Sequence, residues 1–393
     1  MTISRLYILY LAALSMLAFL ATDMYLPTFK AMEVDFATGP EQIALSLTVF
    51  LVGLGVGQLL WGIASDKFGH RNTLLCGLAI FTLASFGLVF CDQIWQLLTL
   101  RLVQAFGVCA PTVIWQAMVI KRHDAPTRQR LFSTIMPLVA LSPALAPQLG
   151  VLLAHLFHWQ SIFVCLTLIG FGLAFITLRQ PQDKVEPKQT SMAADMTTLF
   201  RNRSYLGNIM MYAMASAAFF SYLTGMPEIM AKLGYDAKAI GLSFVPQTIA
   251  FMAGGYLGKS IVRKWGDQKT LSRLLQLFSV SAVIVFIATQ CQLTSIWPIL
   301  LPFCFLAAAN GATYPIIVNH ALSSAKQSPA TAAGVQNSLQ IGICSIASAI
   351  VAALASHAQM VTGDVILICM VGLWIGYAIT KRAKPQSEES LSS

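Results

Sequence analysis

Long apolar runs follow one another along almost the whole chain and are separated by short polar segments. A membrane-spanning helix needs about 20 mostly apolar residues, because the hydrocarbon core is roughly 30 Å thick and a helix rises about 1.5 Å per residue. The pattern predicts twelve spanning helices, at residues 6–27, 41–63, 73–91, 94–120, 130–155, 160–178, 205–229, 239–262, 272–291, 294–322, 330–357 and 361–380. We interpret the first run as a retained span, because it has the full length and lacks a small-residue cleavage site.

The longest polar interval divides these runs into two sets of six. Residues 179–204 are rich in charge and proline, which is typical of a linker between bundles. The expected organisation is an N-terminal six-helix bundle over 1–178, a cytoplasmic linker over 179–204, a C-terminal six-helix bundle over 205–380 and a disordered cytoplasmic tail over 381–393. Two similar loops, GIASDKFGHR at 62–71 and GKSIVRKWGDQK at 258–269, indicate an internal duplication.

Composition and charge agree with a membrane protein rather than a soluble one. Hydrophobic residues make up 56% of the chain and charged residues 10%, which is far from the averages of soluble proteins. The net charge of +9 is explained without a nucleic-acid partner. If both termini are cytoplasmic, the 25 Lys and Arg residues lie on the cytoplasmic side, apart from Lys30, Lys232 and Lys238 outside and Arg101 within a span. This asymmetry is the positive-inside rule, so we expect that orientation and no nucleic-acid partner.

No motif favours an enzyme, a metal site or ATP-driven transport. The eight cysteines form no CxxC or Cys/His cluster, so we expect them to behave as apolar residues. The stretch GGYLGKS at 254–260 ends like a phosphate loop, but Ala253 stands where that loop needs a glycine. His155 and His158 have H-x-x-H spacing without an acid. A membrane enzyme or a receptor is therefore the weaker alternative to a transporter, and we expect no cofactor and no metal.

Two charged residues interrupt the apolar runs. Asp23 lies near the end of the first predicted span, and Arg101 lies within the fourth. A charge in a span costs roughly 2.5 to 3.5 kcal/mol on insertion scales, so it usually faces a partner or a wet cavity. Helix geometry places Asp23 about 5 Å and Arg101 about 10 Å from the outer ends of their helices.

At these similar depths the two side chains can interact directly or through water. A conformational change that alters the surroundings of Asp23 would then alter its proton affinity, which is the requirement for proton coupling. A static ion pair that fixes helix packing is the alternative.

Three motifs carry a resemblance to a transporter family. The loop GIASDKFGHR resembles the loop signature of the major facilitator superfamily at Gly62, Asp66, Lys67, Gly69 and Arg71, although His70 stands at a usually arginine position. DMYLP at 23–27 resembles the first-helix signature of the Bcr/CflA drug-resistance branch, and LRLVQAFG at 100–107 resembles its fourth-helix arginine motif. The resemblance covers essentially the whole chain. It implies an all-α integral membrane fold with twelve transmembrane helices in two pseudo-symmetric six-helix bundles.

The same resemblance implies a function. In relatives, the loop signature stabilises one conformation of the transport cycle, and the acid and arginine that match Asp23 and Arg101 take part in proton coupling. We therefore expect a monomeric, proton-coupled secondary transporter of the bacterial inner membrane, favouring an efflux antiporter that exchanges small amphipathic drugs or metabolites for protons. The alternative is a proton-coupled transporter of purine nucleosides or nucleobases, whose direction stays open.

The fifth predicted span contains three prolines and a glycine. Pro137, Pro143 and Pro147 remove backbone hydrogen-bond donors and should bend the helix, while Gly150 allows close packing. The family's antiporter motif places a Gly-Pro pair ahead of a Gly-Gly pair, and here Ala146 and Val151 replace two of those three glycines. We expect an antiporter-like kink at Pro143, Pro147 and Gly150, with an ordinary kinked packing helix as an equal alternative.

Polar and aromatic residues inside spans predict substrate contacts. Buried amides need hydrogen-bond partners and aromatic rings offer flat faces, so we expect a cavity for planar, partly polar molecules. Each such residue can instead be an interhelical contact. The preferred cavity residues are Tyr25, Trp115, Gln116, Tyr222, Gln247 and Asn310. Glu228 lies near the outer end of the seventh span, where an interfacial acid is expected and a gating residue is the alternative.

Overall fold

The computed structural model describes residues 4–182, 192–291, 294–325 and 328–382. The described part of the chain is helical and contains no strand. The segment 183–191 of the predicted linker and the segment 383–393 of the predicted tail lie outside the described residues.

Twelve helices of 19 residues or more occupy the positions of the predicted spans within these ranges. They are α1 (Arg5–Asp23), α3 (Pro40–Phe68), α4 (His70–Leu88), α5 (Ile94–Arg122), α6 (Ala125–Leu156), α7 (Gln160–Leu178), α9 (Arg203–Lys232), α10 (Ala237–Trp265), α11 (Asp267–Gln290), α12 (Trp297–Ser324), α13 (Pro329–Ala353) and α14 (Ala358–Arg382). The shorter elements are η1 (Leu26–Thr28), α2 (Phe29–Asp35), α8 (Met192–Arg201) and η2 (Ala355–His357).

Ten segments of the described chain are long and apolar enough to cross a membrane. The helix α6 contributes a shorter apolar segment, Leu145–Leu156. The predicted all-helical membrane fold is therefore confirmed, while the number of segments that meet these requirements is ten rather than twelve. All eight cysteines are free thiols.

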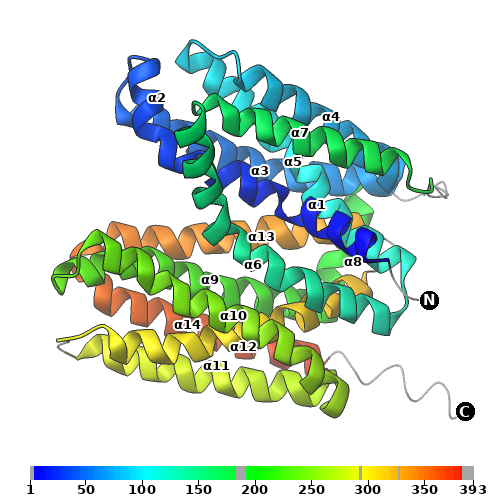
Figure 1. The fold of residues 1–393 in the computed structure, drawn as a ribbon. Coiled ribbons are helices and arrows are strands. Elements are labelled where there is room, and N and C mark those ends of the chain that lie inside the picture. Colours follow the sequence, from blue (N-terminus) through cyan, green and yellow to red (C-terminus); the bar gives the residue numbers. More distant parts are fainter. Residues whose placement is uncertain (1–3, 183–191, 292–293, 326–327, 383–393) are drawn as a thin grey trace, which may run out of the picture. The chain divides into compact units, whose positions relative to one another are not determined.

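The described residues divide into two compact units. Unit 1 contains residues 4–123, 141–182, 192 and 328–338, and unit 2 contains residues 124–140, 193–291, 294–325 and 339–382. Within unit 1, α5 packs against α1, α3 and α4, and α4 packs against α7 (Figure 1). Within unit 2, α9 packs against α12 and α14, and α12 packs against α10 and α11. The predicted bundle boundaries place each predicted span entirely in one bundle. These boundaries remain a prediction.

The two similar loops of the sequence adopt the same turn. Gly69 ends α3 and precedes α4 with φ of 88°, and Gly266 ends α10 and precedes α11 with φ of 76°. Glycine adopts this left-handed region without the steric cost that a side chain would add. The sequence repeat therefore corresponds to equivalent one-residue connections between long helices in the two units.

Candidate functional site

The guanidinium group of Arg101, in α5, joins three helices of unit 1. Arg101 is completely buried. Its Nη1 donates hydrogen bonds to the carbonyl oxygen of Ala21 in α1 at 3.0 Å and to Oε1 of Gln104 at 2.6 Å. Gln104 in turn donates from Nε2 to Oγ of Ser85 in α4 at 2.8 Å. A single buried charge thus connects α1, α4 and α5.

Two aromatic rings face the same guanidinium group. The Cζ atom of Arg101 lies 4.0 Å from the ring centroid of Tyr25 and 4.0 Å from that of Phe50. Both rings are buried, and the hydroxyl group of Tyr25 forms a hydrogen bond with Oγ of Ser46 at 3.2 Å. A desolvated cation–π contact contributes about 2 kcal/mol or more. The rings therefore offset much of the cost of burying this charge.

The carboxylate of Asp23 stands apart from this network. Asp23 is the last residue of α1 and is half-buried. Among the described residues, its side chain makes no hydrogen bond and no ion pair. The direct form of the expected interaction with Arg101 is therefore absent. Arg101 instead contacts the backbone two residues before Asp23 and the ring two residues after it, so the guanidinium group lies at the level of the acid.

The C-terminal half of α6 approaches the backbone next to Asp23. A Cβ atom placed on Gly150 would lie 1.7 Å from the carbonyl oxygen of Met24, so only glycine permits this approach. Pro147 lies one turn earlier and is half-buried, and the side chain of Pro143 lies outside the described part of the structure. The helix continues from Ala125 to Leu156 through these prolines. The sequence did not indicate that Gly150 contacts the neighbour of the acid.

The loop signature after α3 contacts the first turn of α13, within unit 1. The carboxylate of Asp66 accepts hydrogen bonds from the backbone N–H of Ala330 at 3.3 Å and of Thr331 at 2.7 Å. A carboxylate at this position satisfies N–H groups that have no partner within the helix and interacts favourably with the helix dipole. A Cβ atom on Gly62 would lie 2.5 Å from the carbonyl oxygen of Ala330. Gly62 and Asp66 together hold the loop against α13.

The other three residues of the signature have separate contacts. Lys67 lies over the ring of Phe68 at 5.4 Å, and Gly69 forms the connection to α4. Arg71 donates a hydrogen bond from Nη2 to the carbonyl oxygen of Leu178, at the C-terminal end of α7, at 2.6 Å. The signature therefore binds helix ends to one another rather than lining a ligand site.

The six predicted cavity residues are buried, and they are divided between the two units. Tyr25, Trp115 and Gln116 belong to unit 1, and Tyr222, Gln247 and Asn310 belong to unit 2. In unit 1, Gln116 donates a long hydrogen bond of 3.5 Å to Oδ1 of Asn337.

Glu228 and Lys232 form an exposed i,i+4 pair at 3.6 Å, which agrees with the interpretation of Glu228 as an interfacial acid. Such exposed pairs contribute little to stability.

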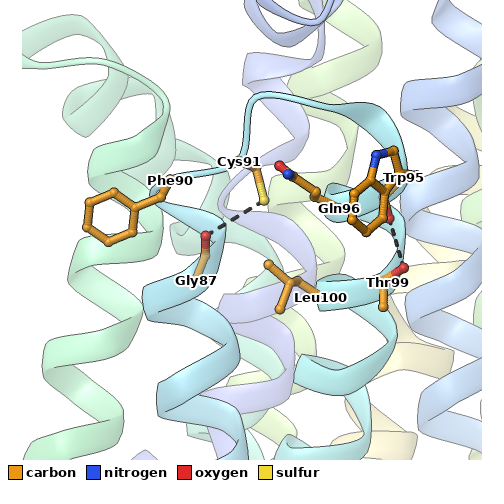
Figure 2. Close-up of a pocket in the computed structure, with 7 residues that line it drawn as sticks. All are labelled: Gly87, Phe90, Cys91, Trp95, Gln96, Thr99 and Leu100. Carbon is orange, nitrogen blue, oxygen red and sulfur yellow. Dashed lines mark hydrogen bonds between the residues drawn. The ribbon is translucent and has the colours of Figure 1, made fainter.

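A pocket of about 380 Å³ lies at the turn between α4 and α5 (Figure 2). It is lined by Gly87, Phe90, Cys91, Trp95, Gln96, Thr99 and Leu100. None of the predicted site residues lines it. Exposed Phe90 and Trp95 at a helix end are typical of the interfacial aromatic belt of membrane proteins. The candidate functional site therefore remains the predicted pair Arg101 and Asp23, and this pocket is not part of it.

Sequence reasoning missed several contacts of this site. Nothing in the sequence indicated that Phe50 contacts Arg101, because phenylalanine is common in apolar runs. Gln104 carried a weak one, since it follows Arg101 by three residues and must share its helix face. Across the described residues, no group of three or more His, Cys, Asp and Glu side chains is arranged to hold a metal ion.

Relatives of known name resemble this chain over most of its length. It is 26% identical over 371 residues to a bicyclomycin resistance protein homolog of Haemophilus influenzae, covering 93% of this chain and 92% of that protein. It is 24% identical over 346 residues to multidrug resistance protein D of Escherichia coli, covering 86% and 85%.

A solved structure and a family model agree with the helical architecture. The transporter FucP, solved in an outward conformation, matches with a TM-score of 0.79 at 13% identity and covers 97% of this chain and 99% of that chain. This likeness supports the fold alone. The model of the Major Facilitator Superfamily matches residues 11–352. The chain therefore belongs to the Major Facilitator Superfamily and is a multi-pass membrane transporter rather than an enzyme.

Proposed function

We propose that this protein is a proton-coupled exporter of the bacterial inner membrane that acts as a monomer and exchanges protons for small amphipathic drugs or metabolites. The names of its relatives, bicyclomycin and multidrug resistance proteins, support drugs as the exported class. One observation carries proton coupling. The carboxylate of Asp23 is half-buried and has no partner among the described residues, although it lies at the level of the guanidinium group of Arg101, which contacts other residues.

In this arrangement, protonation of Asp23 breaks no ion pair. The two hydrogen bonds and the two aromatic contacts of Arg101 do not involve the carboxylate of Asp23. The proton affinity of a carboxyl group depends on its access to water and on nearby positive charge. Movement of the end of α1 against α5 or α6 changes both quantities. Proton binding at Asp23 is then linked to the conformation of the transporter.

The loop signature is proposed to stabilise one state of the transport cycle. The contact of Asp66 with Ala330 and Thr331 exists only while the loop lies on the first turn of α13. A hydrogen bond to a charged group contributes about 1.5 to 3 kcal/mol. Separation of the loop from α13 therefore has a definite free-energy cost, which gives the protein a preferred resting state.

A purine nucleoside or nucleobase is a second candidate cargo. The observation that favours it is the buried pair Tyr222 and Phe303, whose rings are stacked at 3.5 Å and nearly parallel, as a planar ring would stack beside them. The direction of transport is then open. Uptake of labelled nucleoside, compared with drug-resistance profiles of a deletion strain, separates the two cargoes.

Purified protein in proteoliposomes with an imposed proton gradient tests the coupling. Asp23→Asn should abolish gradient-driven transport and leave expression largely unchanged, because an amide cannot exchange a proton at this position. Asp92→Asn is the matched control, because Asp92 is an exposed acid outside the helices. Full gradient-driven transport by the Asp23→Asn variant would remove Asp23 from the mechanism.

A further inference from the structure

Three basic side chains gather where the first half of α6 meets the end of α10, within unit 2. The ammonium group of Lys259, in α10, donates a hydrogen bond to Oγ1 of Thr134, in α6, at 2.5 Å. The same hydroxyl group donates to the carbonyl oxygen of Arg130 at 2.7 Å, and Arg130 is close enough to repel Lys259. Arg263 follows Lys259 by four residues, so it shares that face of α10. We call Arg130, Lys259 and Arg263 the basic cluster.

The basic cluster has no acidic partner within the described chain. None of its three side chains forms an ion pair there. Residues 125–140 of α6 and 237–265 of α10 contain no Asp or Glu. The first acid after α10, Asp267, contacts His320 instead. The like charges therefore repel one another without compensation, and an anion bound among them lowers their electrostatic energy.

Lys259 is the member of the cluster that lies furthest from the helix end. It is half-buried and precedes the last residue of α10 by six positions, or about 9 Å along the axis. Its Nζ atom also lies 5.6 Å from the ring centroid of Tyr256, which is exposed. A hydroxyl group and a ring position the ammonium group without neutralising it. Because exposed tyrosines favour the headgroup level of a membrane, this charge lies where lipid phosphates are found.

Close packing of α6 on α10 holds the cluster together. A Cβ atom on Gly255 would lie 2.4 Å from Cγ of Pro137. Gly255 precedes Lys259 by four residues, and Pro137 follows Thr134 by three, so this contact lies about one turn from the hydrogen bond and on the same helix faces. A binding site fixed in this way loses little entropy when a ligand binds.

An exposed stripe leads from the basic cluster along α10. Leu242, Ile249, Tyr256 and Arg263 follow one another at intervals of seven residues, which is close to two helical turns, so they lie on one face. Leu242 and Ile249 are 59% and 62% exposed.

This stripe decides between a lipid and a small soluble anion. From Leu242 to Tyr256 it extends about 21 Å, which exceeds the roughly 15 Å hydrocarbon depth of one membrane leaflet. An acyl chain gains from an apolar surface of this length, whereas a free phosphate ion does not. Positive charge at one end of the stripe and apolar side chains along the rest match the two parts of a phospholipid.

We propose that the basic cluster binds the phosphate group of an anionic phospholipid whose acyl chains lie along the exposed stripe of α10. In the expected orientation, the start of α6 and the end of α10 are cytoplasmic, so the lipid belongs to the inner leaflet. A zwitterionic headgroup gains less, because its own cation offsets the phosphate charge. The bound phosphate bridges α6 and α10. The inference depends on neither the proton coupling nor the cargo.

Native mass spectrometry of the purified full-length protein in detergent tests the proposal. Dioleoylphosphatidylglycerol is the anionic probe, dioleoylphosphatidylcholine has the same chains without net charge, and glycerol 3-phosphate has the phosphate without chains. Phosphatidylglycerol should bind about tenfold more tightly than either of the others. Equal affinities for the two lipids would overturn the anionic preference. Equally tight binding of glycerol 3-phosphate would overturn the assignment to a lipid.

Variants assign the preference to the basic cluster. Lys259→Gln and Arg130→Gln should each lower the affinity for phosphatidylglycerol about fivefold and leave that for phosphatidylcholine unchanged, because one charge beside the phosphate is lost. Arg130 is exposed, so its variant provides the test if Lys259→Gln does not fold. Lys121→Gln is the matched control, since Lys121 is an exposed cation near the end of α5 in unit 1. An equal loss in this control would indicate general attraction to basic residues and contradict a specific site.

Discussion

Arg101 illustrates how a buried positive charge can be stabilised without an acid as its partner. The ring of Phe50 covers one face of its guanidinium group. The substitution Phe50→Leu removes this aromatic face while keeping an apolar side chain. We expect this substitution to lower the free energy of unfolding by about 2 kcal/mol. Thermal or denaturant unfolding in detergent micelles measures the change.

Phe171→Leu provides the comparison for this prediction. The side chain of Phe171 also belongs to unit 1 but is 66% exposed on α7, where a smaller apolar residue removes little packing. An equal loss of stability in the two variants would show that the aromatic face has no special role at Arg101.

At the level of single residues, sequence identified the two charges but not how they are compensated. Asp23 and Arg101 were visible because each interrupts an apolar run. Their similar depth predicted an interaction, either direct or through water, whereas the structure gives Arg101 two rings and a backbone carbonyl as partners. Hydropathy cannot distinguish an ion pair from this arrangement, because an aromatic residue that covers a charge and one that faces lipid are equally apolar in the sequence.

At the scale of helices, the contact between α6 and the end of α1 connects the proline-rich helix with the acid. Gly150→Ala places a Cβ atom against the carbonyl oxygen of Met24 and must displace one of the two helices. We expect gradient-driven transport to fall by about tenfold or more, with a loss of about 1 to 3 kcal/mol in stability. Proteoliposome transport and unfolding measurements check the two effects.

Gly172→Ala is the matched substitution for Gly150→Ala. A Cβ atom on Gly172 in α7 has no heavy atom within 4 Å, so this variant should transport and unfold like the unchanged protein. Normal transport by both variants would argue against a role for the contact between α6 and α1.

The contact of Asp66 with α13 gives a second prediction at this scale. Asp66→Asn removes the charge that faces the N-terminus of α13, so the amides of Ala330 and Thr331 should exchange with solvent about fivefold faster. Hydrogen–deuterium exchange of the first turn of α13 measures this effect. Asp267→Asn alters the corresponding loop of unit 2, where Asp267 pairs with His320, and should leave that turn unchanged. The same exchange rate in both variants would contradict the role of Asp66.

For the molecule as a whole, the membrane explains why so much of the fold was predictable. The required apolar length fixed the helices to within a few residues, and the span predicted at 160–178 coincides with α7. The division of α6 and α13 between the two units was not predictable, because hydropathy reports burial from water and does not report which helices are neighbours. The helix α8 was missed because it is short and polar, within an interval interpreted as a linker.

Orientation in the membrane is the remaining prediction for the whole molecule. Because all but four of the Lys and Arg residues lie in segments assigned to the cytoplasm, we expect both termini to be cytoplasmic. A fluorescent protein fused after Ser393 should fluoresce, and alkaline phosphatase fused after Asp92 should be active outside the cytoplasm.

The reverse pattern of fusion activities would also reverse the proposed coupling. In the expected orientation, Asp23 ends α1 on the outer side, where it can receive a proton that moves down the gradient. In the opposite orientation it would face the cytoplasm, and proton entry at Asp23 could not drive release of a drug to the outside. The topology measurement therefore tests the direction of transport as well as the arrangement of the helices.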